Sequence, residues 1–327
     1  MAARSGPAAR RLRPPAAVAL LLPAVLLLPP AGVDAREHPH PGTVIPADDS
    51  GLFLETEGSG PPIVLLPAAP GLDHGYFHPY LTSLAAHATV VYYDPRGCGR
   101  SAAGPPGAYG LEPAVADLER ARLRLGREQI DLLGHGYGAA VAILYAGRHP
   151  ERVGRLILIG PTPRASTFLD AAGLRGALTG RMREAIAALE GDRYLSADGR
   201  LRERIRILAP LLFHRLTDRS FHGAFVDGMT VSAAPYDAAA ASIEGPDLLP
   251  ALGRLRQPIL IVAGRHDRTA SPDDVEAVRR AAPSARLSIL EESGSMPFAD
   301  QPVEFLKTVR AFLEETAGRV AGAGGGI

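Results

Sequence analysis

The chain has 327 residues, and its 35 basic and 35 acidic side chains give a formal net charge of zero at pH 7. This balance provides no electrostatic attraction for nucleic acid, so no partner of that class is expected. With 46% hydrophobic residues, the chain suits one large domain with a substantial core. The single cysteine, Cys98, excludes an internal disulfide.

The first residues of the chain have the pattern of a secretory signal peptide, which we place at residues 1–35. Basic residues are followed by an apolar stretch at 16–28, and small residues around Ala35 suit signal peptidase. Pro23 interrupts the apolar stretch, which is too short for a comfortable membrane span. We therefore expect a secreted or extracytoplasmic protein without a stable membrane span after cleavage. The pair Arg10-Arg11 raises the twin-arginine route, and an uncleaved anchor is the alternative.

Residues 43–57 predict two antiparallel edge strands, in which Leu52, Leu54 and Thr56 alternate with Phe53 and Glu55. Alternation of this kind places successive side chains on opposite faces of a sheet.

Continuous apolar runs downstream predict strands that are buried on both faces, the mark of a parallel sheet. A helix with apolar residues at helical spacing is expected over 111–125, and a closing helix over 302–315. Strands that alternate with helices imply right-handed crossovers and helices on both faces of the sheet. The fold class is therefore α/β, with a doubly wound, mostly parallel sheet. The expected strands lie at 63–66, 90–93, 130–133, 153–159, 258–262 and 287–290.

One long insertion interrupts the strand pattern. Residues 163–250 contain only amphipathic helical patterns and predict a helical lid over the carboxyl ends of the strands. The core then comprises residues 36–162 and 251–316, and the Gly-rich residues 317–327 are expected to form a disordered tail.

Residues 131–140, D-L-L-G-H-G-Y-G-A-A, join an apolar strand to a helix of small residues through a glycine-rich turn. A strand, a tight turn and a helix in this order are the context of a nucleophile elbow, G-x-S-x-G. The raised position of this turn is Gly136, which carries no side chain. We expect Gly136 to have a positive φ.

Four motifs resemble the α/β-hydrolase superfamily, and within it the proline iminopeptidase-like branch, over roughly residues 43–315. Residues 93–101, Y-D-P-R-G-C-G-R-S, are similar to the D-x-R-G-x-G-x-S turn of that branch. Residues 67–71, P-A-A-P-G, stand where the branch has its H-G-G-P-G oxyanion loop. Residues 264–267 resemble the acid loop, and residues 293–298 resemble the histidine loop.

The resemblance also shows what the chain lacks. It places the nucleophilic serine at Gly136 and the catalytic histidine at Ser295, so only the acid, Asp267, is retained. No histidine follows His266 in the sequence, so the last loop provides no base. By the same resemblance, a carbonyl or anion could bind the backbone amides of Tyr137 and of Ala68 or Ala69, although the alanine side chains are expected to narrow this loop. His74 is expected to line the pocket.

Acyl transfer needs a nucleophile and a base within hydrogen-bond reach, and the loss of either costs several orders of magnitude in rate. We therefore expect a pseudoenzyme that binds at most a small molecule or short peptide in a lidded pocket, with no cofactor and no metal. The triad loss could be natural or engineered. The alternative is a hydrolase or lyase of peptidase, esterase or epoxide type that uses Asp267 or a pocket histidine without a serine. Acidic lid residues that could hold a free amine are Glu184, Glu203, Asp227 and Glu244.

Overall fold

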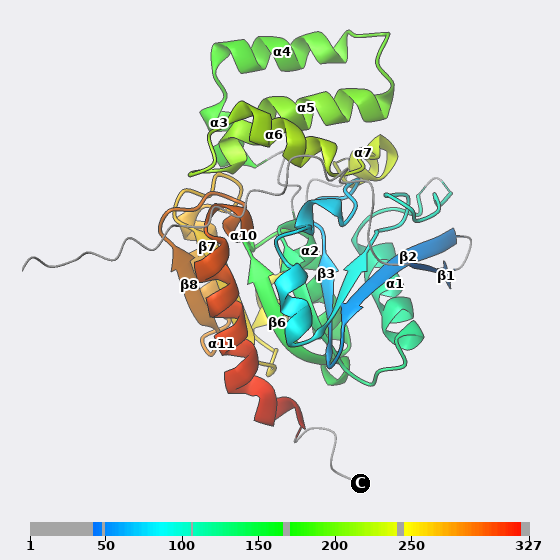
Figure 1. Ribbon diagram of the computed structural model, residues 1–327, viewed down its shortest axis with the longest axis vertical. Coiled ribbons are helices and arrows are strands. Elements are labelled where there is room, and N and C mark those ends of the chain that lie inside the picture. The colour runs from blue at the N-terminus through cyan, green and yellow to red at the C-terminus, as the bar shows by residue number, and fades with distance from the viewer. Residues whose placement is uncertain (1–41, 48–49, 106, 166–170, 241–244, 322–327) are drawn as a thin grey trace, which may run out of the picture. The chain divides into compact units, whose positions relative to one another are not determined.

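An eight-stranded sheet, in the order β1-β2-β4-β3-β5-β6-β7-β8, organises the computed structural model of the protein (Figure 1). The structure describes residues 42–47, 50–105, 107–165, 171–240 and 245–321. The chain divides into two units, Met1–Val33 and Asp34–Ile327, and every described residue belongs to the second. The expected signal peptide and residues 322–327 lie outside the described residues.

Strands β1 and β2 pair antiparallel with each other, and β2 pairs antiparallel with β4. Every other neighbouring pair of the sheet is parallel. This topology confirms the predicted mostly parallel α/β sheet. The strands are β1 (Thr43–Ala47), β2 (Ser50–Gly58), β3 (Pro62–Leu66), β4 (Thr89–Tyr93), β5 (Ile130–His135), β6 (Val153–Ile159), β7 (Ile259–Gly264) and β8 (Arg286–Leu290).

The central strands are buried on both faces, because helices cover each side of the sheet. All residues of β3, β5 and β6 are buried. Alternate residues of these strands belong to two apolar clusters, with Leu65 in one and Leu66 in the other. Helices α1 (Leu111–Arg124), α2 (Tyr137–Arg148), α8 (Leu249–Leu252) and α9 (Pro272–Ala281) contribute side chains to the cluster with Leu66. Helices α10 (Pro297–Asp300) and α11 (Pro302–Ala321) contribute side chains to the cluster with Leu65.

The alternation predicted for β2 is not reflected in its burial. Phe53, Leu54 and Glu55 are all buried, and Glu55 has no exposed area. The reason is that both faces of β2 are covered: Leu54 belongs to the cluster with Leu66, and Glu55 on the other face lies against His74 and Arg100. Of the two strands predicted to lie at an edge, β1 does, whereas β2 lies between β1 and β4. The carboxyl group of Glu55 is therefore fully enclosed.

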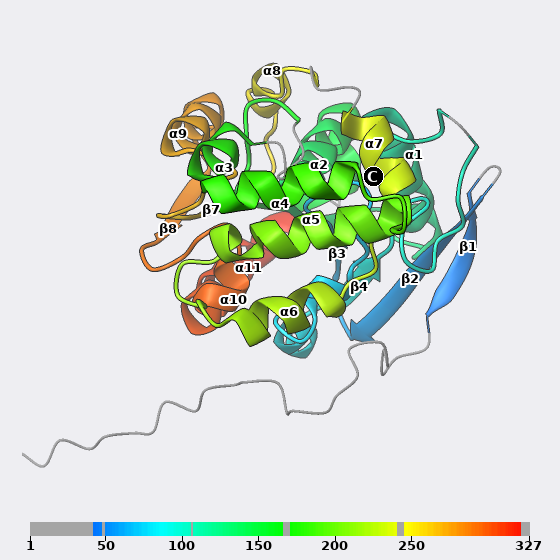
Figure 2. The same ribbon diagram turned by 90° about the horizontal axis from the view of Figure 1, so that it is seen from above.

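Between β6 and β7 the described residues form helices and no strand, apart from an isolated bridge at each of Arg164 and Val231. These helices are α3 (Ala172–Ala177), α4 (Gly180–Glu190), α5 (Ala197–Leu212), α6 (Arg219–Asp227), α7 (Ala233–Ala240) and α8. Figures 1 and 2 show α4, α5 and α6 lying side by side as a layer over one end of the sheet. The predicted helical lid is thus confirmed, although α8 packs with the core cluster on α2 and α9.

The last helix, α11, extends to Ala321 and so includes the first residues of the segment expected to be a tail. Among the described residues, none of the helices combines the length and apolarity that a membrane crossing requires.

Candidate functional site

The turn between β5 and α2 has the geometry of an elbow. Gly136 has φ 51° and ψ −111°, as the sequence predicted, and α2 begins at the next residue. The flanking glycines are required by close backbone contacts. A Cβ atom at Gly138 would lie 2.2 Å from the Leu66 carbonyl oxygen, and one at Gly134 would lie 2.5 Å from the Gly138 carbonyl oxygen. The apex of this tightly packed turn presents no functional group.

Asp267 and Ser295, the positions that the sequence analysis predicts for the acid and for the histidine, lie together. Asp267 follows β7, Ser295 follows β8, and the Ser295 hydroxyl donates to Asp267 Oδ1 at 2.6 Å. The same oxygen accepts from the Thr269 amide and hydroxyl, each at 2.7 Å, and from the Ala270 amide at 3.2 Å. Burial raises the pKa of Asp267, and these hydrogen bonds partly offset the rise. Ser295 therefore occupies the place where a histidine would contact the acid.

Two of the three amides expected to hold a ligand, those of Tyr137 and Ala68, are engaged within the protein. The Tyr137 N–H donates to the Ala68 carbonyl at 3.0 Å, and the Ala68 N–H donates to the Tyr76 hydroxyl at 2.8 Å. The atom nearest to a Cβ built at Gly136 is this carbonyl oxygen, at 3.0 Å, whereas the Ala68 methyl lies at 3.7 Å. We expected the alanine side chains to narrow this loop. In the structure, the Ala68 carbonyl oxygen lies closer to a side chain at position 136 than the Ala68 methyl group does. Ligand binding by Tyr137, Ala68 and Ala69 stays a prediction.

His135 and Tyr76 join the three loops of the site. His135 Nε2 lies 2.9 Å from the Ser295 carbonyl, and Nδ1 lies 3.1 Å from the Tyr76 hydroxyl. We assign the tautomer in which Nε2–H donates to the carbonyl and Nδ1 accepts from Tyr76, because a carbonyl only accepts. Burial lowers the pKa of His135 to about 4. The ring is neutral at pH 7 and supports the elbow. Sequence reasoning missed Tyr76, for which no motif provided a signal.

A second residue that sequence reasoning missed, Asp300, ties the lid to the loop that carries Ser295. Its buried carboxylate accepts from four backbone amides: those of His214, Arg215 and Leu216 after α5, at 2.9 to 3.2 Å, and that of Gly294 at 2.8 Å. The Ser295 amide also donates to the carbonyl of Leu212 at 2.8 Å. The position of Ser295 is thus fixed jointly by the core and the lid.

His74 is completely buried, and its Nδ1 lies 2.6 Å from Asp94 Oδ1. It lines neither of the two cavities described next, and a role for His74 in a ligand pocket stays a prediction.

Two cavities are the candidate ligand sites. The first, of about 50 Å³, lies beside the elbow and is lined mainly by apolar residues together with Tyr93, Cys98 and Tyr137. The second, of about 190 Å³, lies between lid helices α4, α5 and α7. Two acidic residues, Glu190 and Asp237, and two basic residues, Arg200 and Arg204, line this cavity beside Tyr236.

The acidic lid residues expected to bind an amine are arranged otherwise. Glu203 and Asp227 both accept from Arg206, at 3.2 and 2.8 Å, and Glu184 is exposed. Glu244 lies outside the described residues. The described members of this group therefore belong to the lid surface.

Residues 61–302 match the family model of the alpha/beta hydrolase fold, and the chain belongs to this family. It is similar to the proline iminopeptidase of Clostridium botulinum, with 27% identity over 274 residues that cover 80% of this chain and 92% of the relative. Among solved structures it is similar to a thermophilic esterase from Thermogutta terrifontis, with 25% identity and a TM-score of 0.67. That match covers 84% of this chain and 99% of the esterase. An esterase from Exiguobacterium antarcticum, at 23% identity and a TM-score of 0.67 over 84% of this chain and 100% of the esterase, has the same fold.

Proposed function

We propose that this α/β-hydrolase-fold protein binds a small ligand in a cavity between the helices of its lid and lacks serine-hydrolase activity. The observation that carries the proposal is the glycine at the apex of the elbow. Gly136 has the backbone geometry of a nucleophile position, yet it offers no hydroxyl or thiol to form an acyl intermediate.

Two further observations support the absence of acyl transfer. Ser295, bonded to Asp267, cannot act as a general base at neutral pH because a serine hydroxyl does not take up a proton there. The Tyr137 amide, a donor that would stabilise an oxyanion, is bonded to the Ala68 carbonyl instead. Nucleophile, base and oxyanion donor are thus all compromised.

The cavity in the lid favours a ligand that carries both a cationic and an anionic group, as a dipeptide does. Glu190 and Asp237 can attract an amine, and Arg200 and Arg204 can attract a carboxylate. An aromatic side chain, Tyr236, borders the same space and offers an apolar surface.

Two measurements test this function separately. A fluorophosphonate probe should not label the purified protein, and labelling would overturn the proposed inactivity. Calorimetric titration with a panel of dipeptides should show binding that Asp237→Asn weakens about tenfold or more and that Asp273→Asn, an exposed change outside the cavity, leaves unchanged. A complete absence of dipeptide binding would overturn the ligand class.

A second candidate function is hydrolysis that uses Asp267 as a base without a covalent intermediate. The raised pKa of this carboxylate favours it, because a stronger base is better suited to activate water near neutral pH. Ester or peptide turnover by the unmodified protein that disappears in Asp267→Asn would support this candidate.

A further inference from the structure

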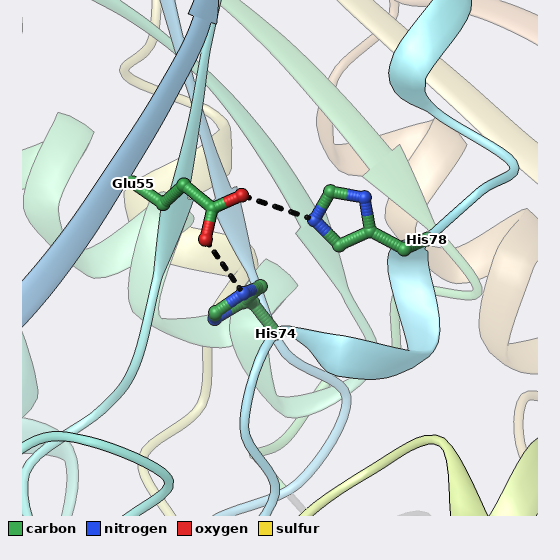
Figure 3. Close-up of side chains that lie close together, drawn as sticks. All are labelled: Glu55, His74 and His78. Carbon is green, nitrogen blue, oxygen red and sulfur yellow. Dashed lines mark ion pairs between the residues drawn. The ribbon is translucent and has the colours of Figure 1, made fainter. Parts of the chain in front are cut away.

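Glu55, His74 and His78 form a cluster that lies apart from the elbow. Glu55 is on β2, while His74 and His78 stand on either side of the short 3-10 helix η1 (Gly75–Phe77). One nitrogen or oxygen atom from each residue lies within 4.8 Å of the other two. Figure 3 shows both imidazole rings turned towards the two carboxylate oxygens. Glu55 Oε2 is 3.8 Å from His74 Nε2, and Oε1 is 3.8 Å from His78 Nε2.

A second carboxylate orients His74. Its Nδ1 lies 2.6 Å from Asp94 Oδ1, so this nitrogen carries the proton and the lone pair of Nε2 faces Glu55. Asp94 is held in turn by the amides of His74 and Arg100, at 3.1 and 2.8 Å. A carboxylate behind an imidazole is the arrangement that fixes metal-binding histidines in proteins.

The ring of His78 is held by stacking. Its centroid lies 4.0 Å from that of Tyr92, with an angle of 24° between the planes. The His78 side chain is 18% exposed, whereas Glu55 and His74 are fully buried. His78 is therefore the member of the cluster nearest to solvent, although its Nε2 atom, like His74 Nε2 and Glu55 Oε1, is buried.

Arg100 competes for the same carboxylate. Its Nη2 donates to Glu55 Oε2 at 2.9 Å, and its guanidinium lies 3.5 Å from the centre of the Phe53 ring. Because this contact uses one oxygen, Glu55 Oε1 still faces His78. Tetrahedral ligands with bonds of 2.0–2.1 Å lie about 3.3 Å apart. The three ligand atoms lie within 4.8 Å of one another, so the side chains would have to close by at most about 1.5 Å to complete the site.

We propose that Glu55, His74 and His78 bind one divalent zinc-class ion, with Asp94 as the partner that orients His74. Two imidazoles and one carboxylate are donors that suit zinc rather than calcium or magnesium, which prefer oxygen ligands alone. The site joins β2 to the segment after β3, far along the chain from Asp267 and Ser295. Its role is to fasten these two segments together in the interior of the protein.

The test measures zinc binding by the full chain after treatment with a chelator. Competition with a chromophoric chelator should show one equivalent of zinc, and saturation should raise the melting temperature. His78→Gln should weaken binding at least tenfold, and Asp94→Asn should weaken it by about 10–100-fold. His87→Gln changes an exposed histidine nearby and should have no effect. Circular dichroism establishes that each variant is folded.

Two sets of outcomes would overturn the site. One is the absence of zinc binding, in which case the cluster is a network of side-chain contacts without a metal. The other is binding that survives His78→Gln or that disappears in His38→Gln/His40→Gln, which would assign the ion to the N-terminal histidines. Glu55→Gln gives an independent check, because it removes the negative charge of the proposed ligand while keeping the shape of the side chain. The folded variant should bind zinc more weakly than the unmodified protein.

Discussion

Ser295 donates its hydroxyl hydrogen to the carboxylate of Asp267 across 2.6 Å, so the loop after β8 meets the loop after β7 at these two residues. Under the proposed function, this contact keeps the framework of a triad without the groups that perform its chemistry. A change at two positions can test whether the framework alone would support catalysis.

Gly136→Ser combined with Ser295→His should restore partial ester hydrolysis, while each single change should stay near background. Serine without a base is a poor nucleophile, and a histidine without serine has nothing to activate, so the pair acts as a unit. Recovery should be partial because the Ala68 carbonyl lies against the elbow and holds the Tyr137 amide. Burst kinetics with an activated ester report the acyl-enzyme. A folded double variant that never acylates would contradict this account.

The Asp300 carboxylate and the four backbone amides that donate to it, here called the Asp300 clamp, join the lid to the loop that carries Ser295. Replacing Asp300 should therefore lower the stability of the protein strongly. Asp300→Ala leaves the four amides of the clamp without their acceptor, and we expect a loss of about 3 kcal/mol or more. Urea denaturation measures this loss, and limited proteolysis should show faster cleavage near residues 214–216. Asp273→Asn, an exposed change on α9, should cost less than about 1 kcal/mol. Equal effects of the two changes would argue against the clamp.

Two glycines, one at the elbow and one in α11, predict alanine substitutions with opposite effects on stability. Gly138→Ala should destabilise the protein by about 3 kcal/mol or more, because its Cβ would lie 2.2 Å from the Leu66 carbonyl oxygen. Gly318→Ala, in α11 with no atom within 4 Å of the added Cβ, should stabilise it by about 0.5–1 kcal/mol. Thermal and chemical denaturation of both variants measure the difference. A tolerated Gly138→Ala would show that the backbone here is looser than described.

The sequence was sufficient to predict the sheet, the lid and the elbow, because continuous apolar runs and the glycine spacing at 134–138 are local signals. It also indicated that Asp267 and Ser295 would be neighbours, through the resemblance of their loops. The contacts of Asp300 and Tyr76 depend on segments far apart in the chain, which no local pattern specifies. Burial of Glu55 was missed for the same reason: its enclosure depends on the position of β2 within the sheet.

The lowered pKa of His135 predicts a pH dependence of stability that can be isolated by mutation. Its pKa falls from the ordinary 6.5 to about 4 because burial disfavours the charged ring. The unfolded chain therefore binds more protons than the folded protein between pH 6.5 and 4. The contribution of the neutral ring is complete above pH 6.5 and is lost as the pH falls towards 4, by about 3 kcal/mol in total.

Asp73 opposes this trend, because burial and then the charge of Asp94 raise its pKa from 3.8 to about 6. Its contribution to stability is present at low pH and is lost as the pH rises towards 6. The pH dependence of the total stability therefore does not isolate the contribution of His135. The free energies of unfolding of the unmodified protein and of His135→Gln should instead be compared at several pH values, since their difference cancels the effect of Asp73. That difference should grow as the pH rises from 4 to 6.5, and a difference independent of pH would show that His135 titrates normally in the folded protein.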